Sequence, residues 1–347
     1  MIYPFGHKGL NAKLVNTLKS FSEIILLDYQ SYYDSISNDD NLYKIKIEQK
    51  MLFSEHKIFK RIFHSINLIN MKRITTEEDY DAILIMTYEN ISFSFINFLF
   101  KKKPVFLVHH NTIDLLNSRL NKYFFQKYMN KVNHIVFAEF IKEGLIEKTN
   151  VDRKRVTILE HPLSNNILVD KNRIVNNRNN NRVFVGLGLG SDEGLIKKLI
   201  ELDKKESLFK KSGIKVILRS EKQEYESEGL KVFTGILPED EYYELYNMAS
   251  AYLLLYPSSY QNRFSGSILN ALQSGKCVIG TDIPLVRNFS ELYPNNCRIA
   301  YDIKHLLNQL ITSNFDFSIE EYELFINKHS DATVLQNLKE IFDTENE

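Results

Sequence analysis

The sequence predicts an α/β protein of two consecutive doubly wound domains, each a parallel β-sheet with helices on both faces. The chain has 347 residues, more than one hydrophobic core usually organises. In both halves short apolar runs alternate with longer amphipathic stretches, which is typical of parallel strands joined by crossover helices. A polar stretch rich in Asn and Arg, residues 172–182, interrupts the alternation and indicates a boundary between the domains.

In the first half, the short apolar runs are bounded by turn residues and the longer stretches carry apolar residues at helical spacing. We expect strands at Ile2–Phe5, Ile24–Asp28, Ala82–Met86, Val105–His109, His134–Phe137 and Thr157–Glu160. We expect helices at Lys8–Lys19, Met51–Asn70, Ile91–Phe100, Asn117–Asn130 and Phe140–Thr149.

The alternation of short apolar runs and longer amphipathic stretches resumes after the polar stretch. Strands are expected at Val183–Gly186, Lys215–Arg219, Lys231–Thr234, Ala251–Tyr256, Lys276–Gly280 and Arg298–Tyr301, and helices at Gly194–Leu202, Asp240–Met248 and Gly266–Ser274. A last helix, Ile319–Phe342, follows the sheet and is expected to pack back across the interdomain region. The expected organisation is a first domain at 1–165, a linker at 166–181, a second domain at 182–318 and a C-terminal helix at 319–347.

Composition excludes several classes of protein. Apolar residues make up 44% and charged residues 25% with zero formal net charge, which argues against disorder and against a nucleic-acid-binding protein. Two cysteines, Cys277 and Cys297, form neither a disulfide framework nor a metal-ligand spacing, so we expect a reducing cytosol and no bound metal. We find neither a secretory signal at the start nor an apolar run of about 20 residues that would span a membrane.

Charge is distributed unevenly along the chain. Up to Glu160 there are 23 Lys and Arg against 18 Asp and Glu, and the remainder has 21 against 26. Residues 51–73 combine an apolar helical stripe with basic residues, and Lys101–Lys103 stand beside Phe98 and Phe100. A basic amphipathic helix of this kind is able to lie on a membrane surface. The alternative is that the stripe faces the core and its charges are solvated.

The most informative segment is Tyr256–Pro284. Here an apolar strand ends, a polar loop follows, and a helix begins at Gly266. Ser265, Gly266 and Ser267 place backbone N–H groups at the helix N-terminus, which is a site suited to an anion, and Arg263 stands just before it. The alternative is an ordinary helix cap beside a surface arginine.

Several residues of this segment resemble the donor-site signature of group 1 glycosyltransferases. That signature has a Pro-Ser strand end, a loop with Phe-Gly, a Glu-Ala pair, a small residue before Gly, and Pro-Val-Ile. The matching residues are Pro257-Ser258, Phe264, Ala271, Ser274-Gly275 and Val278-Ile279, with similar runs upstream at Gly235–Leu237, Glu244–Tyr246 and Ala249-Ser250. Val183–Gly186 resembles the first strand of the family's C-terminal domain, and Val136–Ala138 with Thr157–Pro162 resembles the end of its N-terminal domain. The resemblance implies a GT-B fold, in which two Rossmann-like domains face a cleft.

The chain departs from that family at four positions. The family's two glutamates, near the transferred sugar and on the ribose hydroxyls, fall on Asn262 and Asn270. Its phosphate-binding Arg and Lys fall on Leu187 and Glu193. An amide at Asn270 is still able to hydrogen-bond a diol. Other cations must balance a diphosphate, and Arg219, at a strand end, and Arg263 are the candidates.

The first half offers weaker signals. Gly6 and Gly9 flank a turn after the first expected strand, where backbone would approach a ligand phosphate, although the missing third glycine disfavours a dinucleotide such as NAD. His109 follows an expected strand, where it would orient the sugar or acceptor, or act as a base if the reaction inverts. The alternative is a histidine pair, His109-His110, in a surface turn with no role.

The resemblance implies a metal-independent, cytoplasmic glycosyltransferase. It would use a nucleotide diphosphate-sugar as co-substrate and no cofactor, and a saccharide or lipid-linked acceptor of bacterial cell-surface polysaccharide synthesis, with possible peripheral contact with the inner membrane surface. Domain 182–318 would bind the donor and domain 1–165 the acceptor. The expected catalytic residues are His109 and Asn262, and the expected donor-binding residues are Gly6, Gly9, Arg219, Tyr256, Ser258, Arg263, Phe264, Ser265, Gly266, Ser267 and Asn270.

Two other functions stay open. The missing Glu, Arg and Lys suit a catalytically silent relative that acts as a binding or scaffold protein. A sugar-nucleotide epimerase of the same fold would need more acid and base carboxylates than this loop carries. The family implies retention of the anomeric configuration, which the two asparagines leave in question.

Overall fold

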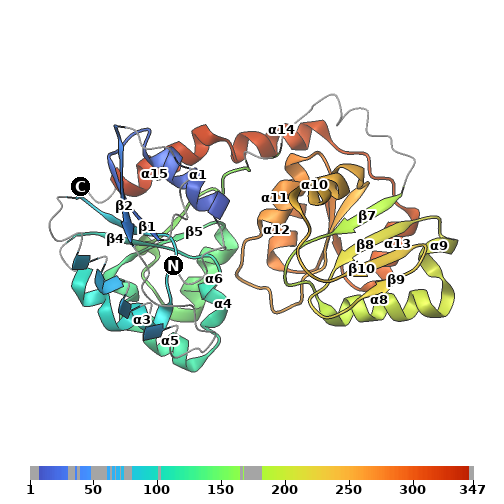
Figure 1. Ribbon diagram of the computed structural model, residues 1–347, viewed down its shortest axis with the longest axis horizontal. Helices are drawn as coiled ribbons and strands as arrows, with labels where there is room; N and C mark the ends of the chain where they lie inside the picture. The colour runs from blue at the N-terminus through green and yellow to red at the C-terminus, as the bar shows by residue number, and fades with distance from the viewer. Residues whose placement is uncertain are drawn as a thin grey trace. The chain divides into compact units, whose positions relative to one another are not determined.

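A computed structural model (Figure 1) describes residues 8–29, 36, 40–47, 61–62, 65–66, 68–70, 72–73, 80–100, 103–164, 167 and 182–343. The chain forms two compact units. The first unit comprises Met1–Pro162, Asn262–Phe264 and His329–Glu347, and the second comprises Leu163–Gln261 and Ser265–Lys328. Both units are α/β with parallel sheets, as the sequence predicts.

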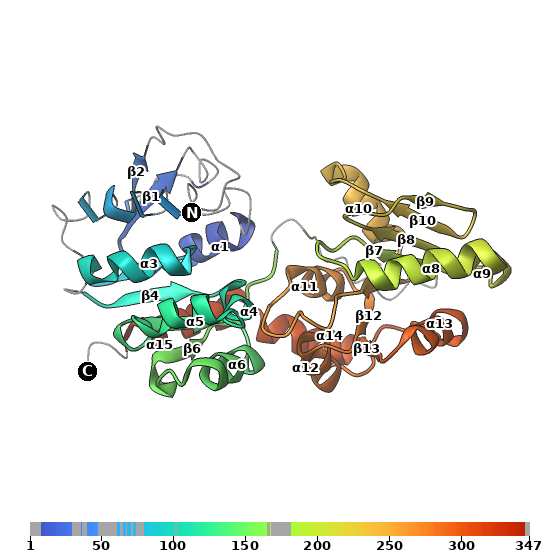
Figure 2. The ribbon, with the colours of Figure 1, turned by 90° about the horizontal axis from the view of Figure 1, so that it is seen from below.

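The second unit is built on a seven-stranded sheet in the order β13-β12-β11-β7-β8-β10-β9, which Figure 2 shows from bottom to top. All neighbours pair parallel except β9 and β10. Counting from β7 and leaving out β9, the spatial order is 3-2-1-4-5-6, that of dinucleotide-binding domains. The strands are β7 (Val183–Gly186), β8 (Lys215–Arg219), β9 (Tyr225–Glu226), β10 (Leu230–Phe233), β11 (Ala251–Leu254), β12 (Cys277–Thr281) and β13 (Cys297–Ala300).

Helices cover both faces of this sheet. α8 and α9 lie along one face and α10, α11 and α12 along the other (Figure 1). Because both faces are covered, strands such as β7 and β11 are buried at every residue and read as continuous apolar runs. The helices are α8 (Glu193–Glu206), α9 (Leu208–Lys211), α10 (Glu239–Met248), α11 (Gly266–Gln273), α12 (Pro284–Leu292), α13 (Ile303–Thr312) and α14 (Ile319–Lys328).

The described part of the first unit has a four-stranded parallel sheet, β3-β4-β5-β6, and a separate parallel pair, β1-β2. The strands are β1 (Ile24–Tyr29), β2 (Leu42–Ile47), β3 (Ile83–Ile85), β4 (Val105–Val108), β5 (Asn133–Val136) and β6 (Val156–Ile158). The helices are α1 (Lys8–Leu18), α3 (Asn90–Ile96), α4 (Thr112–Leu115), α5 (Arg119–Gln126), α6 (Glu139–Thr149) and α15 (Asp331–Asp343), with 3₁₀ turns η1 (Asn97–Phe100), η2 (Met129–Lys131) and η3 (Arg153–Arg155).

Alternate residues of β4 enter two different cores. Val105 and Leu107 pack in the cluster that holds α3, α5 and α6, whereas Phe106 and Val108 pack in the cluster that holds α1 and α15. Successive side chains of a strand point to opposite faces, so one short strand serves both layers. The sheet that positions His109 is therefore fixed by packing on both sides.

The C-terminal segment consists of two helices where the sequence predicts one. α14 ends at Lys328 within the second unit, and α15 begins at Asp331 within the first. Val334, Leu338 and Ile341 of α15 enter the core beside α1, and Asp331 pairs with Lys13 at 2.7 Å. Among the described residues, no helix is long and apolar enough to cross a membrane.

The observed elements differ from the predicted ones in other places. Strand β2 and helices α12 and α13 were absent from the prediction, although α13 has apolar residues at regular helical spacing (Ile303, Leu306, Leu307, Leu310 and Ile311). The predicted strand Ile2–Phe5 lies outside the described residues. Of the predicted helix Met51–Asn70, residues 61–62, 65–66 and 68–70 are described, and all of these are helical.

Truncating Leu338 tests whether α15 completes the core of the first unit. Leu338 is fully buried, so Leu338→Ala is expected to lower the free energy of unfolding by about 2–5 kcal/mol. The matched control is Leu324→Ala on α14, where the side chain is 57% exposed and the expected change is below about 0.5 kcal/mol. Urea unfolding measures both, and equal effects would contradict the assignment of α15.

Candidate functional site

The second unit gathers polar groups at the carboxyl edge of its sheet. In an open α/β sheet ligands bind outside the carboxyl ends of the strands, where the strand order reverses. Here that point lies between β7 and β11, which are neighbours in the sheet although three strands, β8, β9 and β10, lie between them in the sequence. Four features belong to this edge: the turn after β7, Arg219 at the end of β8, Tyr256 after β11, and the N-terminus of α11.

Tyrosine hydroxyls hold the turn after β7 close to β11. The backbone N–H of Leu187 donates to Tyr252 Oη at 2.9 Å. A Cβ at Gly188 would lie 2.8 Å from Tyr256 Oη, so a larger residue at that position would displace the tyrosine ring. The close approach of the backbone to Tyr256 therefore favours glycine at position 188. The role of Tyr252 could not be predicted from the sequence, because a tyrosine within an apolar strand looks like an ordinary core residue.

The N-terminus of α11 has the form that the sequence predicts for an anion site. Ser265 is the N-cap, and its Oγ accepts from the N–H of Ser267 at 3.3 Å and lies 2.8 Å from Tyr256 Oη. A Cβ at Gly266 would meet no atom within 4 Å, so space is open beside Gly266. The N–H of Gly266 and the helix dipole favour an anion there, whereas the N–H of Ser267 already donates to Ser265.

Asn270 and Arg219 both act on the hydroxyl of Tyr242 in α10. Burial raises the pKa of this hydroxyl, and hydrogen bonds to neighbours that include Asn270, together with the weaker effect of the Arg219 charge, oppose the rise. Two predicted donor-binding residues, 51 positions apart in the sequence, thus influence one tyrosine. A guanidinium and a side-chain amide at one edge suit a ligand that carries both a phosphate and hydroxyl groups.

The family that the sequence resembles has phosphate-binding cations at two positions, where this chain has Leu187 and Glu193. Leu187 is buried in the turn after β7. Glu193 begins α8, and its carboxylate accepts from Ser220 Oγ at 2.6 Å and from the N–H of Glu221 at 2.7 Å. The carboxylate thus fixes the turn that follows Arg219. Binding of a diphosphate at this edge would depend on the positive charge of Arg219 and on the N-terminus of α11.

The segment Asn262–Phe264 belongs to the first unit, although second-unit residues flank it in sequence. Its anchor is the buried carboxylate of Asp114 in α4. Oδ1 accepts from the N–H and the Nδ2 of Asn262 at 3.0 and 3.1 Å, and Oδ2 accepts from Arg263 Nε at 2.7 Å. Asp114 therefore offsets the charge of Arg263, which weakens Arg263 as a phosphate ligand. Sequence reasoning missed Asp114, since a single acidic residue in a short helix carries no signal.

Gly144 makes room for Asn262. It lies in the middle of α6, where glycine costs about 1 kcal/mol relative to alanine. A Cβ at this position would lie 1.8 Å from Asn262 Oδ1. Asp114 and Gly144 together form a socket for the Asn262 amide. A glycine in the middle of a helix is the feature of the sequence from which a close approach of Asn262 to α6 could have been suspected.

His109 belongs to a buried chain of hydrogen bonds. His134 Nε2 donates to the carbonyl oxygen of Met129 at 2.8 Å, so His134 Nδ1 must accept. His109 Nε2 then donates to it at 2.9 Å, and His109 Nδ1 accepts from the Tyr88 hydroxyl at 3.3 Å. Burial, with a smaller effect from His134 and His110, holds the pKa of His109 well below its ordinary value.

This network uses both ring nitrogens of His109, and its side chain is 1% exposed. A general base must be within reach of the proton that it removes. The geometry therefore favours a structural role for His109 over the predicted catalytic one. This structural role also differs from the alternative of a histidine without a role in a surface turn, because the ring is buried.

The remaining predicted residues lie apart from this edge or outside the description. Phe264 stacks on His161 at 5.0 Å and packs against Phe137 within the first unit. Ser258 is exposed in the loop after β11, and Gly9 is exposed in the first turn of α1. Gly6 lies outside the described residues. Among the described residues, no group of three His, Cys, Asp or Glu side chains is placed to hold a metal ion.

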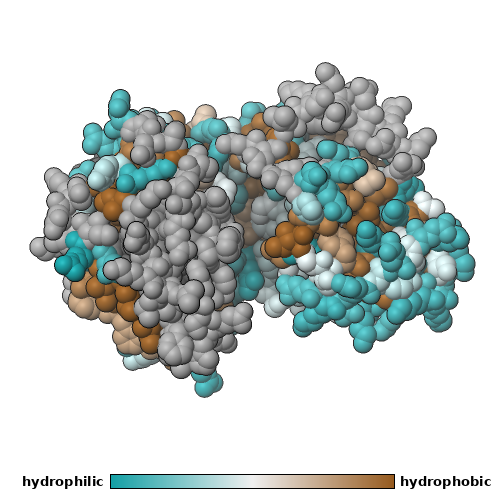
Figure 3. Space-filling model, in the orientation of Figure 1, coloured by the Kyte–Doolittle hydropathy of each residue, from teal (hydrophilic) through white to brown (hydrophobic). Residues whose placement is uncertain are grey.

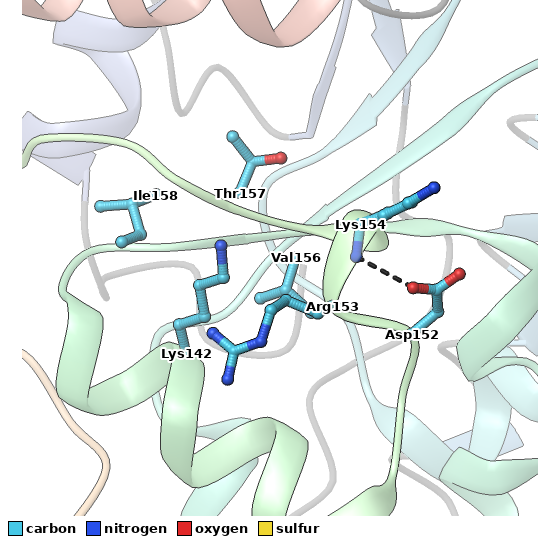
Figure 4. A pocket seen from close by; sticks show the side chains of 7 residues that line it. All are labelled: Lys142, Asp152, Arg153, Lys154, Val156, Thr157 and Ile158. Atoms are coloured by element: carbon cyan, nitrogen blue, oxygen red, sulfur yellow. Dashed lines mark hydrogen bonds between the residues drawn. The ribbon is translucent and has the colours of Figure 1, made fainter.

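A surface recess in the first unit contains none of the predicted site residues (Figure 4). Lys142, Arg153 and Lys154 give it a basic lining, beside Asp152, Val156, Thr157 and Ile158. The guanidinium of Arg153 makes two hydrogen bonds to the carboxylate of Glu143. Its charge is thus already balanced, and we assign no function to the recess.

The structure resembles solved glycosyltransferases over nearly its whole length. Alr3699/HepE of Anabaena, solved with UDP and glucose, is 10% identical over 99% of this chain and 97% of that chain, with a TM-score of 0.63. A glycosyltransferase from Rickettsia africae is 12% identical over 97% and 95%, with a TM-score of 0.62. UGT89C1 of Arabidopsis thaliana, solved with quercetin, is 13% identical over 98% and 96%, with a TM-score of 0.58.

The class of fold follows from these likenesses. The chain has the GT-B fold of two Rossmann-like domains, which confirms the predicted fold class. By sequence, the chain matches no protein-family model and none of the curated proteins. At these identities the neighbours establish the fold, and the activity has to be argued from the site.

A double-mutant cycle tests the socket for Asn262. In the wild-type background Gly144→Ala would push the Asn262 amide away from Asp114, and we expect a loss of about 1–3 kcal/mol in the free energy of unfolding. In an Asn262→Ala background the same change should gain up to about 1 kcal/mol, because alanine favours the helix. Urea unfolding of the four proteins measures the coupling. The same sign in both backgrounds would contradict the contact.

The buried histidines should make the stability of the first unit depend on pH. Burial lowers the pKa of His134 from 6.5 to about 4. The unfolded chain therefore binds a proton that the folded chain excludes. The stabilisation is complete above about pH 6.5 and about 3 kcal/mol is lost as pH falls to about 4. A shallower decline of urea stability with pH is expected for His134→Gln, and an unchanged slope would refute the assignment.

Proposed function

We propose that the protein is a glycosyltransferase that moves a sugar from a nucleotide diphosphate-sugar to an acceptor. One observation carries the proposal: the α11 N-terminus and Arg219 both lie at the carboxyl edge of the sheet where its strand order reverses. A helix N-terminus, a guanidinium and the amide of Asn270 on the same helix are groups that suit a diphosphate and a ribose. The solved neighbours support it, since one of them is Alr3699/HepE in complex with UDP-glucose.

In this proposal the nucleotide lies against the second unit. The N–H group of Gly266, the N-terminal end of the α11 dipole and the guanidinium of Arg219 would bind the diphosphate, and Asn270 would bind the ribose. Tyr256 and Tyr260, stacked at 4.5 Å, would border the ligand. Asp114 would act as a positioning residue that holds Asn262, and His109 would support the fold of the first unit.

The finer parts of the proposal come from the family resemblance. The acceptor would be a saccharide or a lipid-linked saccharide of bacterial cell-surface polysaccharide synthesis, and the protein would work at the cytoplasmic face of the membrane. The reaction would need neither a metal ion nor a cofactor besides the nucleotide-sugar. Turnover is therefore expected to continue in EDTA, and a transfer activity that EDTA abolishes would overturn the metal-independent mechanism.

A second function is favoured by Leu187 and Glu193, which replace the family's phosphate-binding cations. A silent relative would bind a nucleotide and transfer no sugar. Release of nucleoside diphosphate from a panel of UDP-, GDP-, CDP- and dTDP-sugars, with saccharide acceptors present, separates the two functions. Nucleotide binding without turnover for any pair would favour the silent relative.

Calorimetric titration with the same nucleotides tests the proposed site. Arg219→Ala removes a charged hydrogen-bond donor and is expected to weaken binding about 10- to 100-fold. The matched control is Arg298→Ala near the amino end of β13, which should leave the affinity unchanged. Arg263→Ala should have a smaller effect than Arg219→Ala, because Asp114 already pairs with Arg263. Full affinity in Arg219→Ala would place the site elsewhere.

A further inference from the structure

Helix α5 presents its apolar side to solvent. Leu120, Tyr123 and Phe124 have the spacing of one helical face, yet Leu120 and Tyr123 are each more than half exposed. Phe125 is the buried residue of this helix. In a helix of a globular domain the apolar stripe normally faces the core. The arrangement in α5 therefore leaves a stripe that needs another partner.

The exposed stripe continues onto α3 and η1. Phe95 packs against Phe124 with ring centroids 5.2 Å apart, and Tyr123 lies 5.4 Å from Phe124. Phe95 and Phe98 are each more than half exposed. Figure 3 shows apolar surface at the lower left, where Figure 1 places α3. We refer to Phe95, Phe98, Leu120, Tyr123 and Phe124 as the aromatic patch.

The charges around the aromatic patch are almost all positive. Among the described residues of the range 90–132, five are Lys or Arg (Lys103, Arg119, Lys122, Lys127 and Lys131) and one is acidic, Asp114, in a chain whose formal net charge is zero. Asp114 is buried and paired with Arg263. Lys127 lies over the rings of Tyr123 and Phe124, at 4.5 and 5.1 Å from their centroids. Arg119 and Lys131 are also exposed.

We propose that the aromatic patch and its surrounding cations dock the first unit on an anionic lipid bilayer. Aromatic rings prefer the boundary between lipid headgroups and acyl chains. Lysine and arginine beside them are attracted to a negative membrane surface. The charge pattern commits the surface to a bilayer, because a second copy would place like charges opposite one another.

The sequence left open whether residues 51–73, with Lys101–Lys103 beside Phe98 and Phe100, lie on a membrane or face the core. The aromatic patch shares Phe98 with that interpretation, and its other residues come from α3 and α5. The inference deepens the proposed function, since a lipid-linked acceptor would be held in the same bilayer. It rests on that function for the identity of the acceptor alone, and the bilayer binding is independent of it.

Co-sedimentation of the full-length protein with vesicles tests the proposal. Binding is expected to vesicles that contain phosphatidylglycerol and to fall when phosphatidylcholine is used alone or salt is raised. Phe95→Ser with Tyr123→Ser should weaken binding about tenfold or more. Lys122→Glu with Lys127→Glu should weaken it on the charged vesicles to a similar extent.

The matched control is Tyr301→Ser with Ile236→Ser, which removes two exposed apolar side chains of the second unit. It should bind vesicles as the wild type does. Light scattering after gel filtration measures self-association of each protein. Equal vesicle binding by the patch variants and the control would overturn the proposal. The proposal would also be overturned if the wild type formed a dimer that the patch variants cannot form and the wild type did not bind vesicles.

Nucleotide titration of the same variants separates this inference from the proposed function. The aromatic patch lies outside the second unit, so the patch variants should keep the nucleotide affinity of the wild type. Vesicle binding without any nucleotide binding would uphold the docking surface and reject the donor site. Nucleotide binding without vesicle binding would uphold the donor site and reject the docking surface.

Discussion

Burial of parallel strands on both faces is the constraint on which the rest of the structure depends. A strand such as β4 or β11 has no solvated face, so its side chains must be apolar throughout. Polar and charged groups then gather where strands end. In the second unit the order of strands makes one such edge special, because the chain reverses direction across the sheet beside β7. The site follows from topology as much as from residue type.

The charges at the matched positions differ from those of the group 1 glycosyltransferases that the sequence resembles. In the second unit Glu193 stands where that family has a cation, and it fixes the turn after Arg219. In the first unit Asn262 stands where that family has a carboxylate, and its N–H lies 3.0 Å from Asp114 Oδ1, while Arg263 pairs with the other oxygen of Asp114. The negative charge next to this loop therefore comes from α4.

Much of the fold could be predicted from the sequence, because apolar runs and crossover lengths are local properties. The strands Val183–Gly186 and Lys215–Arg219 were predicted to the residue. The candidate site was less accessible. Ser265–Ser267 could be recognised from helix capping, since capping is local. The Asp114 anchor and the Tyr88–His109–His134 chain join residues far apart in sequence, and no spacing rule connects them.

The order of the segments along the chain has a consequence for synthesis on the ribosome. The second unit is nearly continuous, from Leu163 to Lys328, and is complete before the C-terminus is made. The first unit begins earlier but needs α15, whose Val334 and Leu338 fill its core beside α1. The N-terminal sheet must therefore wait, with part of its apolar surface uncovered, until α15 has been synthesised. A chain that stops before Asp331 would finish its later half and leave its earlier half open.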